Sequence, residues 1–238
     1  MRGEEHHPQV KKMLQTWQKY TVFLFSVLAL CLAVFPGTAQ TAKHIVVIDA
    51  AHGGDDAGVL GVDGAAEKDV TLAIALALQK ELAKGGNMEV ALTRNTDRTL
   101  SLDERKKAIS KINPALVLSL HANGGFGKNA TGFELYYPGF SKAGAANKTA
   151  KAAAPDYGYL NDTVKLARLV QKNLDSLFPR QGRGLREAGI PLAEGLALPV
   201  LVVEIGFITN ADGKKKLTSV KTQAEIAGAL AKSIQAFF

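Results

Sequence analysis

The sequence predicts an α/β protein with a single domain, in which a mostly parallel or mixed sheet carries helices on both faces. Short runs of apolar, β-branched residues alternate along the chain with longer amphipathic segments. Strands that are apolar throughout are typical of a sheet covered on both faces, and their alternation with helices indicates an α/β fold. No internal repeat and no Pro- or Ser-rich linker divides residues 40–238, so we expect one domain there.

The individual elements follow from hydrophobic periodicity and from helix start and stop signals. Strands are expected at residues 44–49, 89–93, 115–120, 132–137 and 200–203, and helices at residues 67–84, 101–113, 162–178 and 222–238. Ser101 and Glu104 form the pattern of a capping box, in which each side chain accepts a hydrogen bond from the other residue's backbone N–H. Residues 141–158 are rich in Ala, Lys and Gly without a clear period, and we expect a loop or a short inserted helix there.

The composition is that of a globular chain, and it limits the partners. Of the 238 residues, 47% are hydrophobic and 21% are charged, which excludes wholesale disorder. The net charge is +7, but no arginine-rich stripe or aromatic-basic motif indicates nucleic acid. Such a charge suits a protein that works near an anionic polymer, such as a cell wall, or near a membrane surface. The one cysteine, Cys31, excludes an internal disulfide framework and a cysteine-based zinc finger.

The N-terminal region has the pattern of an export signal. Basic residues precede an almost uninterrupted apolar run at residues 20–35, and small residues follow at the positions that a signal peptidase reads. Residues 1–39 are therefore expected to be a signal peptide cleaved before Gln40. An uncleaved or transient membrane anchor through residues 20–35 is the alternative, although about 15 residues are few for a spanning helix, which needs roughly 20. In both cases we expect the rest of the chain in the periplasm or cell envelope.

Four polar residues stand just beyond the expected strands, where functional groups gather in such sheets. His52 follows the first strand, Glu67 opens the first helix, and His121 and Glu204 each end an apolar run. Two histidines and a carboxylate make a zinc-ligand set that leaves a fourth position open to water, and a further carboxylate suits a general base. Their long spacings match no local metal motif, so the residues alone leave open a second reading, with hydrogen-bonded core histidines and a carboxylate in a helix first turn.

Six groups of residues in chain order carry a family resemblance, namely Ile45–Gly58 with Glu67-Lys68, Leu92-Thr93-Arg94 with Asp97, Ser119–Asn123, Gly132-Phe133-Glu134, Pro199–Phe207 and Thr209-Asn210. Together they resemble the zinc-dependent N-acetylmuramoyl-L-alanine amidases of cell-wall hydrolysis (type 3 catalytic domain), over nearly all of residues 44–238. The resemblance implies that His52, Glu67 and His121 bind Zn²⁺ and that Glu204 is the catalytic glutamate. Residues 40–238 are then the zinc amidase catalytic domain.

The implied reaction is hydrolysis of the peptidoglycan amide between N-acetylmuramic acid and L-alanine, by zinc-activated water with a glutamate base. Asn123 and Arg94 are weaker candidates for substrate contact, with the bracing of loops as the alternative. Arg183 and Arg186 are expected on the solvated surface, with contact to the acidic stem peptide as the alternative. A zinc peptidase that cuts within the stem peptide and a non-catalytic wall-binding module remain open as other functions.

Two features depart from the family pattern. Ala50-Ala51 stands where the family usually has Pro-Gly, and alanine in place of glycine is expected to constrain the turn that presents His52 and so to alter metal affinity. Residues 138–160 form an insert that is shorter and richer in Ala and Lys than the inserted helix of some relatives, which blocks the zinc until an activator displaces it. Self-inhibition and an activator protein as partner are left open.

Overall fold

The structure is a computed structural model that describes residues 12–13, 15–21, 43–125, 130–139 and 158–238. The chain divides into two units, Met1–Ala42 and Lys43–Phe238. The described part of the first unit is helical and exposed, and no helix in the described part of the chain is long and apolar enough to cross a membrane. Most of the apolar run at 20–35 and most of the insert at 138–160 lie outside the described residues, so the signal, the anchor and the insert stay predictions.

Within the described residues, the second unit is built on one six-stranded sheet with the strand order β2-β1-β3-β6-β4-β5. All neighbouring pairs are parallel except β6 and β4, so the sheet is mixed, one of the two arrangements that the sequence predicts. The elements in chain order are β1 (His44–Ala50), η1 (Val62–Gly64), α2 (Glu67–Ala83), β2 (Met88–Leu92), α3 (Leu102–Ile112), β3 (Leu116–Asn123), β4 (Phe133–Pro138), α5 (Gly158–Leu177), β5 (Gly182–Ala188), η2 (Pro191–Ala193), β6 (Val200–Phe207), α6 (Ala211–Leu217) and α7 (Val220–Phe237).

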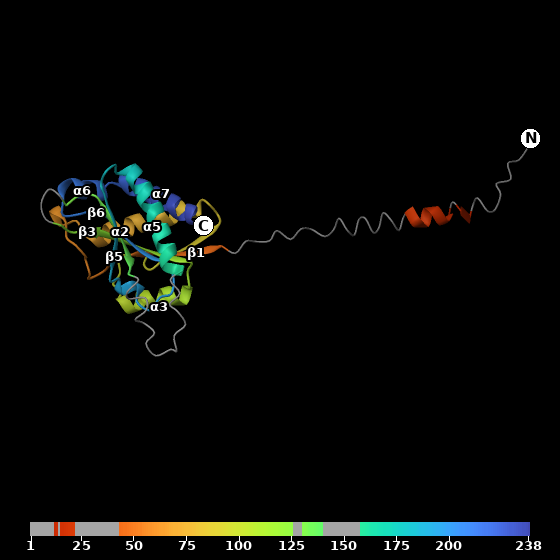
Figure 1. Cartoon of the computed structure of the whole chain (residues 1–238), viewed down its shortest axis with the longest axis horizontal. Helices are drawn as coiled ribbons and strands as arrows, with labels where there is room; N and C mark the ends of the chain where they lie inside the picture. The colour runs from red at the N-terminus through yellow and green to blue at the C-terminus, as the bar shows by residue number, and fades with distance from the viewer. Residues whose placement is uncertain (1–11, 14, 22–42, 126–129, 140–157) are drawn as a thin grey trace, which may run out of the picture. The chain divides into compact units, whose positions relative to one another are not determined.

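Helices cover both faces of this sheet, as predicted. Helices α2, α5 and α7 pack on one face, and α3 lies on the other (Figure 1). Successive residues of a strand point to opposite faces, and β1 shows this alternation clearly. Val46 and Ile48 belong to the larger core under α2, α5 and α7, whereas Val47 belongs to the smaller core beneath α3 and η2.

The predicted helix starts and strands are largely present, and the exceptions have a physical cause. The capping box at the start of α3 is complete, with Ser101 and Glu104 bonded to each other's backbone N–H. Strand β5 and the short α6 are not among the predicted elements. Strand β5 lies at the edge of the sheet and contains glycines and arginines in place of an apolar run, so it lacks the signal of a buried strand.

Strand direction decides which residues meet at one edge of the sheet. Strands β1, β3 and β6 are parallel, so their carboxyl ends lie together. Because β4 runs antiparallel to β6, and β5 is parallel to β4, the amino ends of β4 and β5 lie at this same edge. The late residues of three strands and the early residues of two others are therefore neighbours there.

Candidate active site

A row of polar side chains crosses the sheet at this edge. In the strand register, His121 of β3 pairs with Glu204 of β6, and Glu204 pairs with Glu134 of β4. Directly paired residues on neighbouring strands point to the same face of a sheet. The three side chains therefore lie on one face of the sheet. His121 is two residues beyond Ser119 and so points to the same face, where Ser119 is bonded to Asp49 and Asp49 pairs with Arg105 of α3.

His52 reaches this row from the loop after β1. Its backbone takes a φ of 61°, in the left-handed region that residues other than glycine rarely adopt. The expected constraint from Ala51 is not what the structure shows, because Ala51 is not among the residues with positive φ. The turn is made one residue later, so the conformational strain falls on His52 itself.

Buried arginines hold this strained loop by its carbonyl oxygens. Arg105 of α3 donates from Nη1 to the Ala50 oxygen at 2.8 Å and from Nη2 to the His52 oxygen at 2.6 Å. Its charge is balanced by buried Asp49, whose Oδ1 lies 2.7 Å from the same Nη1. Arg94 donates from Nε to the Ala50 oxygen at 2.9 Å. Charge-assisted hydrogen bonds of this kind are strong, and they fix the position of His52 before any ligand binds.

The three predicted metal ligands converge. One donor atom from each of His52, Glu67 and His121 lies within 4.8 Å of the other two. Glu67, the first residue of α2, places Oε2 3.1 Å from His52 Nε2 and Oε1 3.0 Å from His121 Nδ1. Ligands about 2.1 Å from a tetrahedral zinc ion lie roughly 3.4 Å apart, so the donor types and their spacing fit zinc. Glu67 is buried and both histidines are partly exposed, so the group is accessible from one side.

The electrostatics of this group favour a positive charge among the three side chains. Burial raises the pKa of Glu67, but hydrogen bonds from His121, His52 and two backbone N–H groups outweigh it, and this pKa lies well below its ordinary value. The hydrogen bond to Glu67 is the main cause that raises the pKa of His52 from 6.5 to about 9, against the opposing effect of burial. A proton on His52 and a divalent cation are therefore alternatives for the same negatively charged site.

Asp56 and Gly58 complete the group, and neither had a predicted role. Asp56 Oδ2 lies 2.8 Å from His52 Nδ1, which leaves Nε2 directed toward Glu67. Gly58 has a φ of 66°, and a Cβ there would lie 2.6 Å from both Glu67 Oε2 and His52 Cδ2. An acid four residues after the histidine, in a glycine-rich loop, was the available signal for Asp56.

Glu204 lies beside the group and has an unpaired oxygen. Among the described residues, its Oε2 is buried without a hydrogen-bond partner. Burial raises the pKa of Glu204 from 4.5 to about 7; the carboxylates of Glu67 and Glu134 add to this effect, and His121 opposes it. A carboxyl group with a pKa near neutrality is suited to accept and return a proton. An acid with a buried oxygen that lacks a hydrogen-bond partner is more typical of a functional site than of a structural one.

Glu134 is a buried carboxylate in the row, and no role was predicted for it. Its Oε2 accepts hydrogen bonds from Asn123 Nδ2 at 2.9 Å and from the Tyr136 hydroxyl at 2.7 Å. Its Oε1 lies 2.8 Å from Arg183 Nε and 3.6 Å from Arg186 Nη1. Because both oxygens are engaged, this carboxylate holds its neighbours in place. The signal for it was a lone acid inside an apolar strand.

Comparison with known proteins agrees with this arrangement. The model of the N-acetylmuramoyl-L-alanine amidase family matches residues 46–236, which include all the residues of the group. The chain belongs to this family. A curated family member, N-acetylmuramoyl-L-alanine amidase AmiC of Escherichia coli, is 28% identical over 231 residues, covering 85% of this chain and 55% of AmiC. The chain thus spans about half the length of that relative.

Solved amidase structures share the fold. An N-acetylmuramoyl-L-alanine amidase from Clostridium difficile 630 superposes with a TM-score of 0.70 at 27% identity, covering 83% of this chain and 97% of that one. The CwlD amidase of Clostridioides difficile, solved in complex with the GerS lipoprotein, gives a TM-score of 0.67 at 27% identity, covering 82% and 98%. The α/β fold class predicted from the sequence is thereby confirmed.

The two weaker substrate candidates of this amidase-family chain lie in different surroundings. Asn123 is partly exposed at the end of β3, where Glu134 accepts its hydrogen bond. Arg94 is 1% exposed, and its guanidinium also donates to the carbonyl oxygens of Ala51 and Lys68, at 2.9 and 2.7 Å. These contacts fit the alternative role of Arg94, the bracing of loops, and they leave Asn123 as the accessible candidate.

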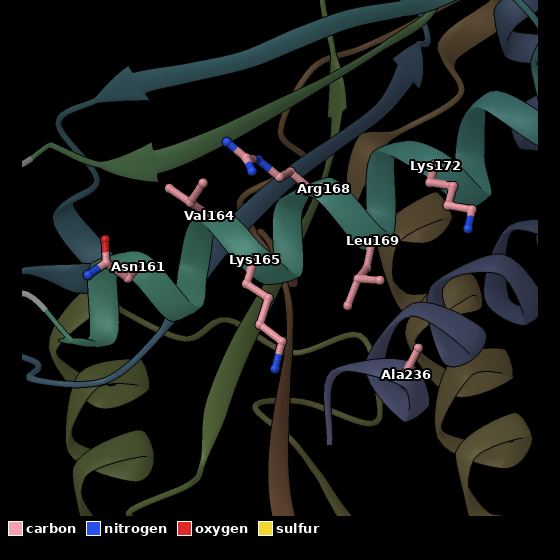
Figure 2. A pocket seen from close by; sticks show the side chains of 7 residues that line it. All are labelled: Asn161, Val164, Lys165, Arg168, Leu169, Lys172 and Ala236. Atoms are coloured by element: carbon pink, nitrogen blue, oxygen red, sulfur yellow. The ribbon is translucent and has the colours of Figure 1, made fainter.

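A groove elsewhere on the domain carries none of this chemistry. It lies between α5 and α7, on the sheet face opposite to the row (Figure 2). Its lining has no histidine or carboxylate and consists of Asn161, Val164, Lys165, Arg168, Leu169, Lys172 and Ala236. Amide hydrolysis needs a metal or a base, so the candidate active site is the histidine and glutamate group at the sheet edge.

Proposed function

We propose that this chain is a zinc-dependent N-acetylmuramoyl-L-alanine amidase, which cleaves the amide bond between N-acetylmuramic acid and the L-alanine of the peptidoglycan stem peptide. The observation that carries the proposal is the convergence of His52, Glu67 and His121 beside Glu204, whose Oε2 is buried without a partner among the described residues. An open metal site with an adjacent base is what hydrolysis of an amide requires. Family membership supports the choice of peptidoglycan as the substrate.

His52, Glu67 and His121 would hold the zinc ion. When bound, zinc polarises the amide carbonyl and lowers the pKa of its water toward about 7. Asp56 orients the His52 ring, and Arg105 fixes the backbone that carries it. These contacts position the ligands in advance, so that little conformational entropy is lost when the metal binds.

Glu204 acts as the general base in this mechanism. A carboxylate oxygen of Glu204 accepts a proton from the attacking water and returns it to the departing alanine nitrogen. Burial raises the pKa of Glu204 to about 7 in the metal-free site, and a bound cation would lower it from there, so the group is ionised near neutral pH and can take the proton. Asn123, held by Glu134 next to this strand, is the residue we assign to substrate contact.

The location and partners follow from this substrate. Peptidoglycan lies outside the cytoplasmic membrane, so we infer that residues 1–39 direct export as a signal peptide, or anchor the chain through residues 20–35. Residues 40–238 then act in the periplasm or cell envelope. CwlD was solved with the GerS lipoprotein, and this supports an activator protein as a further partner of the present chain.

Product analysis tests the proposal against its two alternatives. Purified sacculi are incubated with the zinc-loaded protein, and the released products are identified by mass spectrometry. Intact stem peptides with a free N-terminal L-alanine are expected, because only cleavage next to muramic acid produces them. Fragments cut within the stem would identify a zinc peptidase, and binding without any product would identify a wall-binding module. Either result would overturn the proposed function.

A further inference from the structure

Two arginines of the edge strand β5 converge on Glu134. Arg183 and Arg186 approach the same oxygen of Glu134, at 2.8 and 3.6 Å. The Glu134 side chain is only 5% exposed, whereas those of Arg183 and Arg186 are 38% and 49% exposed. The carboxylate thus lies beneath two guanidinium groups that remain open to solvent.

In the described part of the chain, the buried carboxylate of Glu134 faces two arginines, and arginine is always protonated in proteins. Within the described residues, the approach to Glu134 is the one ion pair of Arg186, and 3.6 Å is beyond hydrogen-bond distance. The guanidinium of Arg186 therefore keeps its donors for another acceptor. A planar fork of N–H donors matches a carboxylate, which it can bind through two parallel hydrogen bonds.

The cluster continues the polar row that contains the metal group. From His121 the row runs through Glu204 and Glu134 to the start of β5, which is three strand spacings, or about 14 Å at about 4.8 Å per spacing. An extended peptide advances by about 3.3 Å per residue, so about four residues span this distance. Arg186 also pairs in register with Tyr136, whose hydroxyl is bonded to Glu134, so it lies on the same face as the row.

We propose that Arg186, with Arg183 beside it, binds a carboxylate of the stem peptide while the amide to be cleaved lies at the metal group. This inference rests on the proposed function and adds a determinant of substrate charge to it. Glu134 has the role of an anchor, because it forms an ion pair with Arg183 and its negative charge offsets the repulsion between the two guanidinium groups.

The test compares two synthetic muramyl peptides, one with free stem carboxylates and one with the same carboxylates amidated. The zinc-loaded full chain is assayed as wild type, as Arg186→Gln, as Arg186→Lys, and as Arg168→Gln. Arg168 is a matched control, because it is exposed on α5 on the opposite face of the sheet. Binding of the acidic peptide to each protein is measured by calorimetry as well, so that KM is not the only measure of affinity.

Wild type is expected to prefer the acidic peptide. In Arg186→Gln the KM and the dissociation constant for that peptide should rise about 10- to 100-fold, as expected for loss of a charge-assisted hydrogen-bonded pair. The ratio of kcat/KM between the two peptides should fall toward one. Arg186→Lys should lose part of the preference, since it keeps the charge without the fork. Arg168→Gln should behave like wild type.

Different outcomes overturn the inference and the proposed function. If wild type cleaves both peptides and Arg186→Gln keeps the same preference as wild type, the carboxylate site is wrong and the amidase function stands. An equal loss of affinity for both peptides in Arg186→Gln would also overturn the inference, because the arginine would then affect folding or the shape of the binding site. If wild type cleaves neither peptide, the proposed function fails, and the inference fails with it.

Discussion

Replacing Glu204 by glutamine separates its proposed chemical role from a structural one. Glutamine keeps the shape of the side chain and can form hydrogen bonds, but it cannot accept a proton at neutral pH. Loss of a general base should slow turnover by roughly 10²- to 10⁴-fold. Zinc content should stay near one ion per chain, because Glu204 is not among the three residues that converge as ligands.

The same substitution has an opposite effect on stability. A pKa of about 7, against an ordinary value of 4.5, corresponds to about 3 kcal/mol at about 1.4 kcal/mol per pH unit. The folded state binds this proton more tightly than the unfolded state does. The stability that the protonated group contributes is therefore fully present below pH 4.5 and is lost as the pH rises through about 7. Glutamine does not ionise, so the variant should gain up to about 3 kcal/mol over wild type across this range.

Both effects can be measured on the same preparations. Hydrolysis of sacculi and zinc content are determined for wild type, Glu204→Gln and Glu89→Gln, the last being an exposed carboxylate on β2 that serves as control. Denaturant unfolding from about pH 4 to 8 is followed with chelator present, because a nearby cation would favour the ionised form of Glu204. Near-normal activity of Glu204→Gln would refute the general-base role. Loss of zinc together with activity would make Glu204 a ligand. A stability difference that does not change with pH would refute the view that the folded state raises the pKa of Glu204.

Three further predictions concern the metal group and its loop. His52→Ala combined with His121→Ala should abolish zinc binding and hydrolysis, and stoichiometric zinc in this variant, measured by atomic absorption, would contradict the ligand assignment. Zinc binding at pH 7 should release about one proton, because a His52 pKa of about 9 leaves the ring protonated beforehand; calorimetry in buffers of different ionisation enthalpy tests this, and affinity should fall as the pH falls. Arg105→Gln should lower the free energy of unfolding by about 3–5 kcal/mol, since it leaves Asp49 buried without its ion pair, and should weaken zinc binding in competition with a chelating dye; unchanged zinc affinity in folded protein would mean that Arg105 does not position His52.

The parts of the fold that the sequence predicts are those with a strong local signal. Strands β1, β3 and β6 are buried on both faces and read as continuous apolar runs. Helix α3 begins with a capping box, which is likewise a local pattern. Strand β5 carries no such pattern, because three of its seven residues are exposed and its pairing with β4 is a property of the assembled sheet.

The residues of the site likewise divide into those with a local sequence signal and those whose roles depend on the assembled fold. His52, Glu67, His121 and Glu204 stand out in sequence because each is a chemically reactive residue at the end of an apolar run or the start of a helix. The anchoring role of Glu134 depends on the pairing of β4 with β6 and β5, which no local pattern encodes. The hydrogen bond from Arg105 to the carbonyl oxygen of His52 likewise depends on how α3 packs against β1.

The reversed direction of β4 places the proposed base, Glu204, close to Arg183 and Arg186. It brings Glu134 directly opposite Glu204, and the negative charge of Glu134 helps to raise the pKa of Glu204. The guanidinium of Arg183, 2.8 Å from Glu134, offsets part of that charge. Loss of Arg183 should therefore raise the pKa of Glu204 further and move the acidic limb of the activity profile to higher pH. A carboxylate bound by Arg186 adds negative charge at the same place, so a substrate with a free acid should shift that limb in the same direction relative to its amidated form.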